Sequence, residues 1–134
     1  MKTFSQFINY LKESINDLAA EFFCKIRESA DIAHHIHLNT DSYAQHKALD
    51  EYYNGVIGLL DSFMEAFIGR YGKIGEYNKN YEMEKTDPIK LLKDIRSYID
   101  ETRHSLGSES ELQNLIDSIV ELLNKTINKL ENLK

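Results

Sequence analysis

Helix-breaking and cross-linking residues are scarce in this 134-residue chain, which has one proline, six glycines and one cysteine. A single cysteine excludes a framework of disulfide bonds within the chain. The glycines and the proline lie mostly outside the periodic apolar segments, which favours an all-helical structure. Cys24 falls inside an apolar helical pattern, so we expect it to be a small buried hydrophobic residue.

Long apolar runs and an excess of positive charge are absent as well. No run approaches the ~18 apolar residues of a membrane-spanning helix, and no basic segment followed by an apolar one resembles an export leader. We therefore expect a cytoplasmic protein that does not insert into a membrane. The 22 acidic and 16 basic residues give a net charge of −6, which repels phosphate backbones, so DNA binding is not expected.

The composition is otherwise that of an ordinary globular domain. Apolar residues make up 42% of the chain and charged residues 28%. The length suffices for one buried core but not for two, so residues 1–134 are predicted to form a single domain.

Apolar residues recur at helical spacing in four segments. The first runs from about residue 3 to residue 33. The Asn-Thr-Asp-Ser sequence at 39–42 favours a break and the start of a second helix, which runs to about Gly69. Residues 71–86 contain two glycines and two asparagines and show no sustained period, so they are predicted to form a connector.

Helix signals resume after the connector. Asp87 is a capping residue followed by Pro88 at the first helical position, and Gly107 is expected to close this third helix. Ser108 and Glu111 have the spacing of a capping box at the start of the fourth helix. Four amphipathic helices with a long connector between the second and the third predict an all-α, ferritin-like four-helix bundle.

Imidazole and carboxylate side chains line one face of the second predicted helix. At about 100° per residue, His46, Asp50, Asp61 and Glu65 fall within an arc of roughly 100°. Such a stripe is most often only a solvated face, but it also suits a divalent metal such as iron, and zinc and manganese accept the same ligands.

These four residues cannot surround one metal ion within one chain. Asp50 and Asp61 lie roughly 16 Å apart along the helix axis. Either the chain carries two unrelated half-sites, or a second copy crosses antiparallel, so that His46 and Asp50 of one subunit face Asp61 and Glu65 of the other. The spacing favours the second arrangement, a symmetric dimer with metal in its seam.

The flank that carries the acids is also suited to packing against a partner. The apolar residues of the second helix centre near −40° from His46, whereas the acids lie between about +40° and +100°. Asn54 and Gly58 lie midway between the two half-sites near the same flank. Because a small residue lets two helices cross closely, we expect the dimer axis to pass near them.

The five residues His34, His46, Asp50, Asp61 and Glu65 resemble the ferroxidase signature of Dps proteins, miniferritins of the ferritin-like superfamily that protect DNA in starved cells. In that family one subunit supplies two histidines and an aspartate, and its two-fold mate supplies an aspartate and a glutamate. All five positions match this pattern in residue type and in spacing.

The resemblance implies an iron-binding ferroxidase, in which peroxide or oxygen oxidises Fe(II) at a site shared across the dimer. His34, His46, Asp61 and Glu65 would hold the iron, with Asp50 as a weaker or second-iron ligand. The family also forms a dodecameric shell and often binds DNA through a lysine-rich tail. Here the N-terminal residues already have a helical pattern and form no basic arm, and the short chain resembles the compact Dps-like proteins that some bacteriophages encode.

The chain departs from the family at an aromatic position. His35 stands where the family usually has tryptophan, and the sequence has no tryptophan. A tyrosine near the site is the alternative electron donor, the candidates being Tyr43, Tyr52 and Tyr53, although tyrosines at helical spacing are mostly core or interface residues.

Two further histidine-containing patterns have a simpler interpretation. His35 and His37 lie near the predicted end of the first helix, where the helix dipole favours a cationic imidazole or where the ring is simply exposed; a zinc or second-iron ligand is the alternative. Glu101 and His104 have the Glu-x-x-His form of carboxylate-bridged di-iron bundles. Only one copy occurs, in a last helical turn, so we do not expect a ligand pair there.

A protein of a different class competes with the ferroxidase. The same scaffold could serve as a non-enzymatic dimeric or oligomeric interaction protein, with a structural or vestigial metal site. The surplus of acidic residues would suit a protein partner or a mimic of nucleic acid. An interaction protein should keep its dimer after substitution of the ligands, whereas a ferroxidase should lose turnover.

Overall fold

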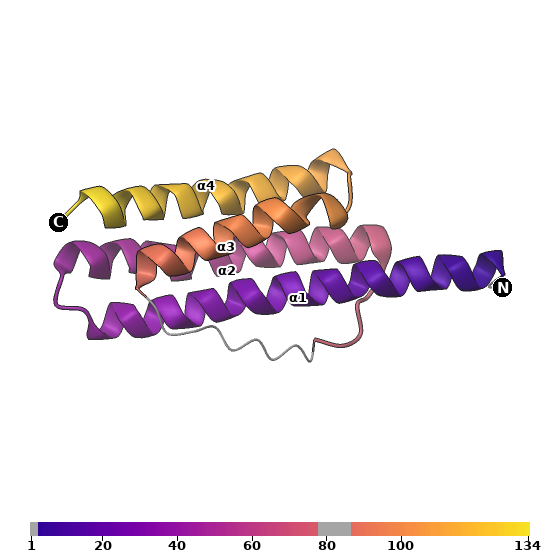
Figure 1. Ribbon diagram of the computed structural model, residues 1–134, viewed down its shortest axis with the longest axis horizontal. Coiled ribbons are helices and arrows are strands. Elements are labelled where there is room, and N and C mark those ends of the chain that lie inside the picture. Colours follow the sequence, from indigo (N-terminus) through magenta and orange to yellow (C-terminus); the bar gives the residue numbers. More distant parts are fainter. Residues whose placement is uncertain (1–2, 78–86) are drawn as a thin grey trace.

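A computed structural model describes residues 3–77 and 87–134, with the side chain of residue 13 excepted. Within these residues the chain is all-helical, and four α-helices pack together lengthwise (Figure 1). The elements are α1 (Phe4–Asn39), α2 (Tyr43–Tyr71), α3 (Pro88–Thr102), the short 3-10 helix η1 (Arg103–Ser105) and α4 (Ser110–Asn132). The predicted all-helical structure is confirmed.

The core lies where apolar faces of all four helices meet. The most extensive contacts are those of α2 with α1 and with α4, while α3 packs on α4 and α1. The largest fully buried side chains come from every helix and include Phe22, Leu49, Tyr52, Phe63, Phe67, Leu92, Ile95 and Ile99, joined by Ile116, Ile119 and Leu123 of α4. None of the helices in the described ranges is both long and apolar enough to cross a membrane.

The first helix is longer than its predicted end near residue 33. It continues to Asn39, because residues 34–39 contain neither glycine nor proline, and it stops only where Thr40 adopts an extended backbone. Ser42 then caps α2 by accepting a hydrogen bond from the backbone N–H of Gln45. This tight turn places the end of α1 beside the start of α2.

The connector leaves α2 at Gly72, whose φ of +94° is a conformation that favours glycine. Residues 72–77 have no regular structure, and 78–86 of the predicted connector lie outside the described residues. Cys24 of α1 is only half-buried, and its Sγ donates a hydrogen bond to the carbonyl oxygen of Tyr77 at 3.1 Å. Cys24 is therefore less buried than expected, because it faces the connector at Tyr77 instead of packing in the core.

The start of α3 agrees with prediction and the start of α4 does not. Asp87 accepts a hydrogen bond from the backbone N–H of Lys90 at 2.9 Å, as a capping residue should. The predicted capping box at Ser108 is wrong, because α4 begins at Ser110 and its N-cap residue is Glu109. The Glu109 side chain makes no capping bond, since it accepts a hydrogen bond from the Tyr71 hydroxyl instead.

Gly107 is required in the α3–α4 connection rather than at the end of α3 itself. The α-helix ends at Thr102 and η1 follows it. Gly107 has a φ of +106°, and a Cβ there would lie 3.0 Å from the Tyr71 hydroxyl oxygen. Gly107 therefore follows η1 instead of closing α3, and the lack of a Cβ lets the α3–α4 connection approach Tyr71 of α2 closely.

Candidate functional site

Three of the five predicted ligands lie in the same region of the fold, where α1 ends and α2 begins, and are linked through neighbouring rings rather than by direct contact. His34 projects from the last turns of α1, and His46 and Asp50 come from the first turns of α2. Two residues that the sequence offered only as alternatives join them through ring contacts: His37, a possible zinc or second-iron ligand, and Tyr53, a candidate electron donor. The tight turn after Asn39 is what brings these side chains together.

His37 and His46 form a stacked pair that joins the two helices. Their ring centroids are 3.7 Å apart, and the ring planes are inclined by 17°. The Nδ1 of His37 lies 2.6 Å from the carbonyl oxygen of His46, and the Nδ1 of His46 lies 2.8 Å from that of His37. Because a carbonyl oxygen only accepts, each Nδ1 carries the hydrogen, and in the neutral ring each Nε2 keeps a lone pair.

This arrangement is the one found in histidine metal ligands, which commonly donate the other ring N–H to a backbone carbonyl. His37 itself was expected to be exposed or to serve the helix dipole. It lies in the last turn of α1 as expected, but only 7% of its surface is exposed. The signal that could have found it is its spacing of three residues from His34, which places both rings on one helix face.

Tyr53 fills the space between the histidines of α1. Its ring stacks on His34 with a centroid distance of 4.1 Å and meets the edge of His37 at 5.2 Å. Of the three tyrosines considered from the sequence, Tyr43 is 76% exposed and Tyr52 is fully buried in the core. Tyr53 is therefore the one that contacts predicted ligands.

The Asp50 carboxylate is held by two donors on one of its oxygens. Its Oδ1 accepts hydrogen bonds from the Tyr53 hydroxyl and from Nδ2 of Asn54, each at 3.0 Å. Burial, followed by the hydrogen bond to Asp50, raises the pKa of Tyr53, which keeps its hydroxyl neutral and donating. Within the described residues no hydrogen bond engages Oδ2 of Asp50, so that oxygen is available to a ligand.

Asp61 and Glu65 lie farther along α2 and do not reach this cluster. Both side chains are exposed, and no hydrogen bond or ion pair joins them to another described residue. Across the described ranges, 3–77 and 87–134, no group of three or more His, Cys, Asp or Glu side chains is placed to hold a metal ion. The five predicted ligands thus fall into two separate sets within one chain, and the prediction that a second copy unites them stays a prediction.

The glycines of α2 differ in what surrounds them. A Cβ at Gly55 would lie 3.1 Å from Cδ2 of Leu122, so the close approach of α4 accounts for this glycine. A Cβ at Gly58 would meet nothing within 4 Å. Asn54, one turn earlier, is also exposed. Packing among the described residues therefore gives no reason for glycine at position 58.

The remaining histidine patterns do not form sites in the described residues. His35 is exposed, and its Nε2 lies 3.9 Å from Oδ1 of Asp31, one turn earlier on α1. His104 lies in η1 whereas Glu101 lies in the last turn of α3, and both are exposed. The Glu-x-x-His spacing therefore does not fall on a single α-helix.

Comparison with known proteins gives one match. No curated protein and no solved structure matches the chain. A family model described as a family of unknown function, DUF5856, matches residues 37–130. The matched segment includes His46, Asp50, Asp61 and Glu65 but not His34. Because the match covers more than two thirds of the chain, this protein belongs to the DUF5856 family, whose function is unknown.

Proposed function

We propose that this protein is a Dps-like ferroxidase, in which two copies pair antiparallel through α2 and oxidise Fe(II) in the seam between them. In this proposal the four packed helices are a ferritin-like four-helix bundle, and the segment between α2 and α3 is its long connector. Iron is the substrate, and hydrogen peroxide or oxygen accepts the electrons.

The observation that carries the proposal is the placement of four ligands about one point of α2. His46 and Glu65 are equally far from the peptide bond between Gly55 and Val56, and so are Asp50 and Asp61. A two-fold axis that passes there brings Asp50 of each copy opposite Asp61 of the other, and His46 opposite Glu65. One crossing of two helices therefore completes both half-sites at once. The exposure of Asp61, Glu65 and Gly58 supports this, since a partner helix could reach all three.

The donor atoms that would meet in the seam suit iron. His46 offers Nε2, because its Nδ1 is engaged by the His37 carbonyl, and Asp50 offers Oδ2, because its Oδ1 is engaged by Tyr53 and Asn54. Imidazole nitrogen combined with carboxylate oxygen is a ligand set that iron accepts, and zinc and manganese compete for it. The hydrogen bonds around His46 and Asp50 hold each ligand in position before the metal arrives.

For this reaction the protein mainly has to bind the iron ions. Two Fe(II) ions supply the two electrons that, with two protons, reduce one hydrogen peroxide molecule to two waters. Three carboxylates neutralise the cations and favour the ferric product, and few ligands per metal leave room for the oxidant. The ring of Tyr53, stacked on His34, is the aromatic group in place to donate an electron where the family's tryptophan is missing.

The test is an anaerobic Fe(II) titration followed by addition of peroxide, comparing wild type with the double variant Asp61→Asn/Glu65→Gln. We expect wild type to bind and oxidise iron and the variant to lose turnover. The control Asp100→Asn/Glu111→Gln removes two exposed acids from α3 and α4 and should keep the wild-type rate. Oxidation at the wild-type rate by the Asp61/Glu65 variant would refute the assignment.

A non-enzymatic interaction protein is the second candidate. It is favoured by the separation of the five ligands within one chain and by the stacked His37–His46 pair, in which each Nδ1 is already bonded to a backbone carbonyl. The same titration separates the candidates, because a dimer that neither binds nor oxidises iron supports the interaction protein. The mass of the particle, measured on the same sample, shows whether pairs assemble further into a dodecameric shell.

A further inference from the structure

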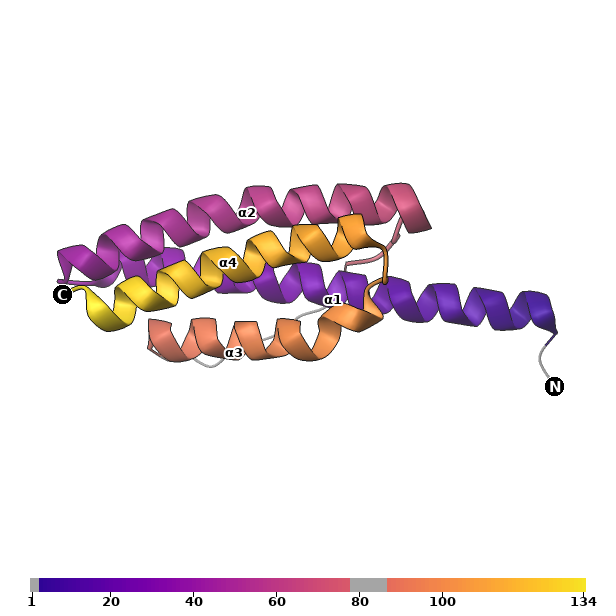
Figure 2. The same cartoon turned by 90° about the horizontal axis from the view of Figure 1, so that it is seen from above.

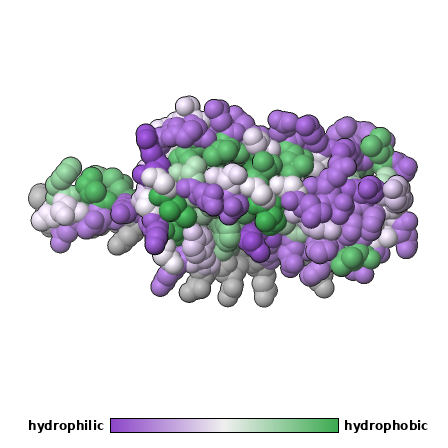
Figure 3. All heavy atoms as spheres, turned by 180° about the vertical axis from the view of Figure 1, so that it is seen from behind, coloured by the Kyte–Doolittle hydropathy of each residue, from purple (hydrophilic) through white to green (hydrophobic). Residues whose placement is uncertain are grey.

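The first turns of α1 extend past the ends of the other helices (Figures 1 and 2). We call residues 4–11 the α1 overhang. Its apolar side chains are exposed: Phe4 by 80%, Phe7 by 48%, Ile8 by 45% and Leu11 by 46%. Figure 3 shows this apolar surface on the projecting end of the molecule. Among the described residues no other helix runs beside it.

The apolar residues of the overhang continue a coiled-coil repeat that begins in the core. Phe4, Leu11 and Leu18 are seven residues apart, and Ile8, Ile15 and Phe22 form a second such series, so the spacing alternates between four and three. A sustained repeat of this kind is the signature of a helix that packs lengthwise against another helix. The inner half of the repeat packs against the core, where Phe22 is fully buried. Among the residues that the structure describes, the outer half has no such partner.

The overhang also lacks charge. Residues 3–11 contain no Asp, Glu, Lys or Arg, although such residues make up 28% of the chain. Depletion of charged residues is typical of the centre of a protein–protein interface. A helix that binds a membrane surface instead carries lysine and arginine on its polar face, and here Lys12 is the first basic residue after position 2.

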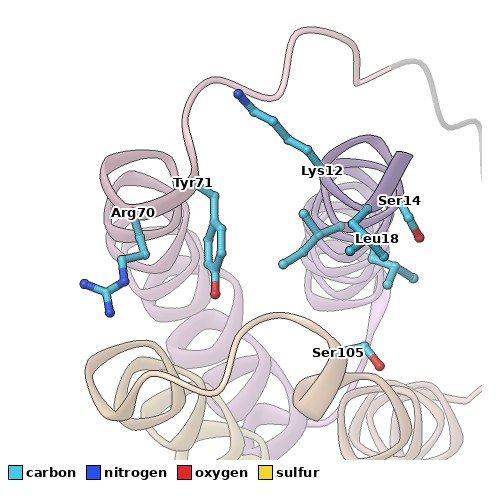
Figure 4. A pocket seen from close by; sticks show the side chains of 8 residues that line it. Lys12, Ser14, Leu18, Arg70, Tyr71 and Ser105 are labelled. Atoms are coloured by element: carbon cyan, nitrogen blue, oxygen red, sulfur yellow. The ribbon is translucent and has the colours of Figure 1, made fainter. Parts of the chain in front are cut away.

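A pocket of about 690 Å³ lies at the base of the overhang (Figure 4). Leu11, Ile15 and Leu18 of α1 form its apolar side. Arg70 and Tyr71 at the end of α2 face them, and Ser105 of η1 lies on the remaining side. The chain thus carries a projecting apolar helix and, beside it, a pocket whose α1 side is apolar and whose rim includes Lys12 and Arg70. An apolar side chain of one copy can therefore pack against the apolar side of this pocket in another copy.

We propose that the overhang pairs antiparallel with the overhang of a second copy of this chain. If the two-fold axis passes at Leu11, Phe7 lies beside Ile15 of the second copy and Phe4 beside Leu18 of the second copy. Phe4 of each chain then enters the pocket of the other. Such a crossing is isologous, so it closes into a discrete pair rather than a filament.

The area available reaches the lower limit for a specific contact. Complete burial of the exposed surface of the four apolar side chains of the overhang would remove about 500 Å² per chain, or about 1,000 Å² in the pair, which is that limit. This surface is distinct from the exposed face of α2, so the pairing does not depend on the proposed ferroxidase seam.

The first test measures the mass of the particle by light scattering over a range of concentrations. The variant Ile8→Glu/Leu11→Glu places charges in the apolar seam, and we expect it to reduce the mass by breaking one interface. The control Gln6→Glu/Asn9→Glu adds the same charge on the opposite helix face and should keep the wild-type mass. Gln6 takes part in the capping box with Thr3, a role that glutamate also fills.

A cross-linking test is independent of α2. In a Cys24→Ser background, Leu11→Cys should form a covalent dimer on mild oxidation, whereas Asn9→Cys should not. Asp61→Asn/Glu65→Gln, which tests the ferroxidase, should leave this cross-link unchanged, so the two proposals fail separately. An unchanged mass for the Ile8/Leu11 variant, or equal cross-linking at positions 9 and 11, would overturn the pairing. A monomer that sediments with neutral or anionic vesicles through these residues would instead identify a lipid surface as the occupant.

Discussion

Substitution of Gly58 by leucine should act in opposite directions on the single subunit and on the assembly. A Cβ at this position meets nothing within 4 Å, so a side chain there has open space in the isolated chain. Glycine in a helix interior is less favourable than alanine or leucine by about 0.5–1 kcal/mol. Gly58→Leu should therefore raise the free energy of unfolding of the isolated subunit by about that amount.

The same substitution should weaken the association of two subunits. In the proposed seam two helices cross near residue 58, and an added side chain has to be accommodated between them. Overpacking costs about 1–3 kcal/mol per site, and a two-fold axis introduces two leucines, so the penalty is about 2–6 kcal/mol. The dissociation constant of the pair should rise at least roughly thirty-fold.

Three measurements on the same samples check this prediction. Urea unfolding followed by circular dichroism, at concentrations where the chain is monomeric, reports the subunit. Light scattering measures the mass of the assembly, and the rate of iron oxidation shows whether the metal site in the seam is intact. Gly69→Leu is the matched control, because a Cβ at Gly69 also meets nothing within 4 Å and the position lies near the end of α2. If Gly58→Leu kept both the wild-type mass and the wild-type rate of iron oxidation, the placement of the seam would be refuted.

Two further predictions concern stability. The Ser29 hydroxyl donates its hydrogen to the Ile26 carbonyl oxygen at 2.6 Å. In the hydrogen bond between Ser29 Oγ and the buried Tyr52 hydroxyl oxygen, which lie 2.7 Å apart, Tyr52 must therefore be the donor. Ser29→Ala should therefore lower the free energy of unfolding by about 1–3 kcal/mol, because it leaves the buried Tyr52 hydroxyl donor unpaired. Tyr52→Phe should lower it by only about 0.5–1.5 kcal/mol. The reverse order in urea unfolding would contradict this prediction. The hydrogen bond from Tyr71 lowers the pKa of Glu109 below its ordinary value of 4.5, so this bond stabilises the fold fully above pH 4.5 and is lost as the pH falls through the lowered pKa. Thermal unfolding between pH 6 and 3 should show a smaller loss of stability for Tyr71→Phe than for wild type, and parallel curves would argue against this linkage.

Local signals in the sequence were sufficient to predict most of the helices. Apolar spacing predicted four helices, and the Asp87-Pro88 signal predicted the start of α3, because a cap satisfies backbone donors within one turn and needs no distant partner. Local signals did not predict the start of α4. There Glu109 accepts a hydrogen bond from Tyr71, which is 38 residues away in the chain. A contact between such distant residues cannot be predicted from the local sequence pattern.

Helical periodicity also predicted the relation among the proposed ligands on α2. Because an α-helix rotates about 100° and rises about 1.5 Å per residue, the sequence alone placed His46, Asp50, Asp61 and Glu65 on one face and in two separate sets. These are distances along a single element, and no other part of the chain alters them.

Only the tertiary structure decided what surrounds those ligands and where the free surfaces lie. The stacking of His37 on His46 and of Tyr53 on His34 depends on how tightly the chain turns between α1 and α2. In the sequence, the apolar repeat at the start of α1 cannot be distinguished from a stripe that faces the core. It is exposed because the other three helices end before they reach it, and the relative lengths and offsets of packed helices follow from packing rather than from any local pattern.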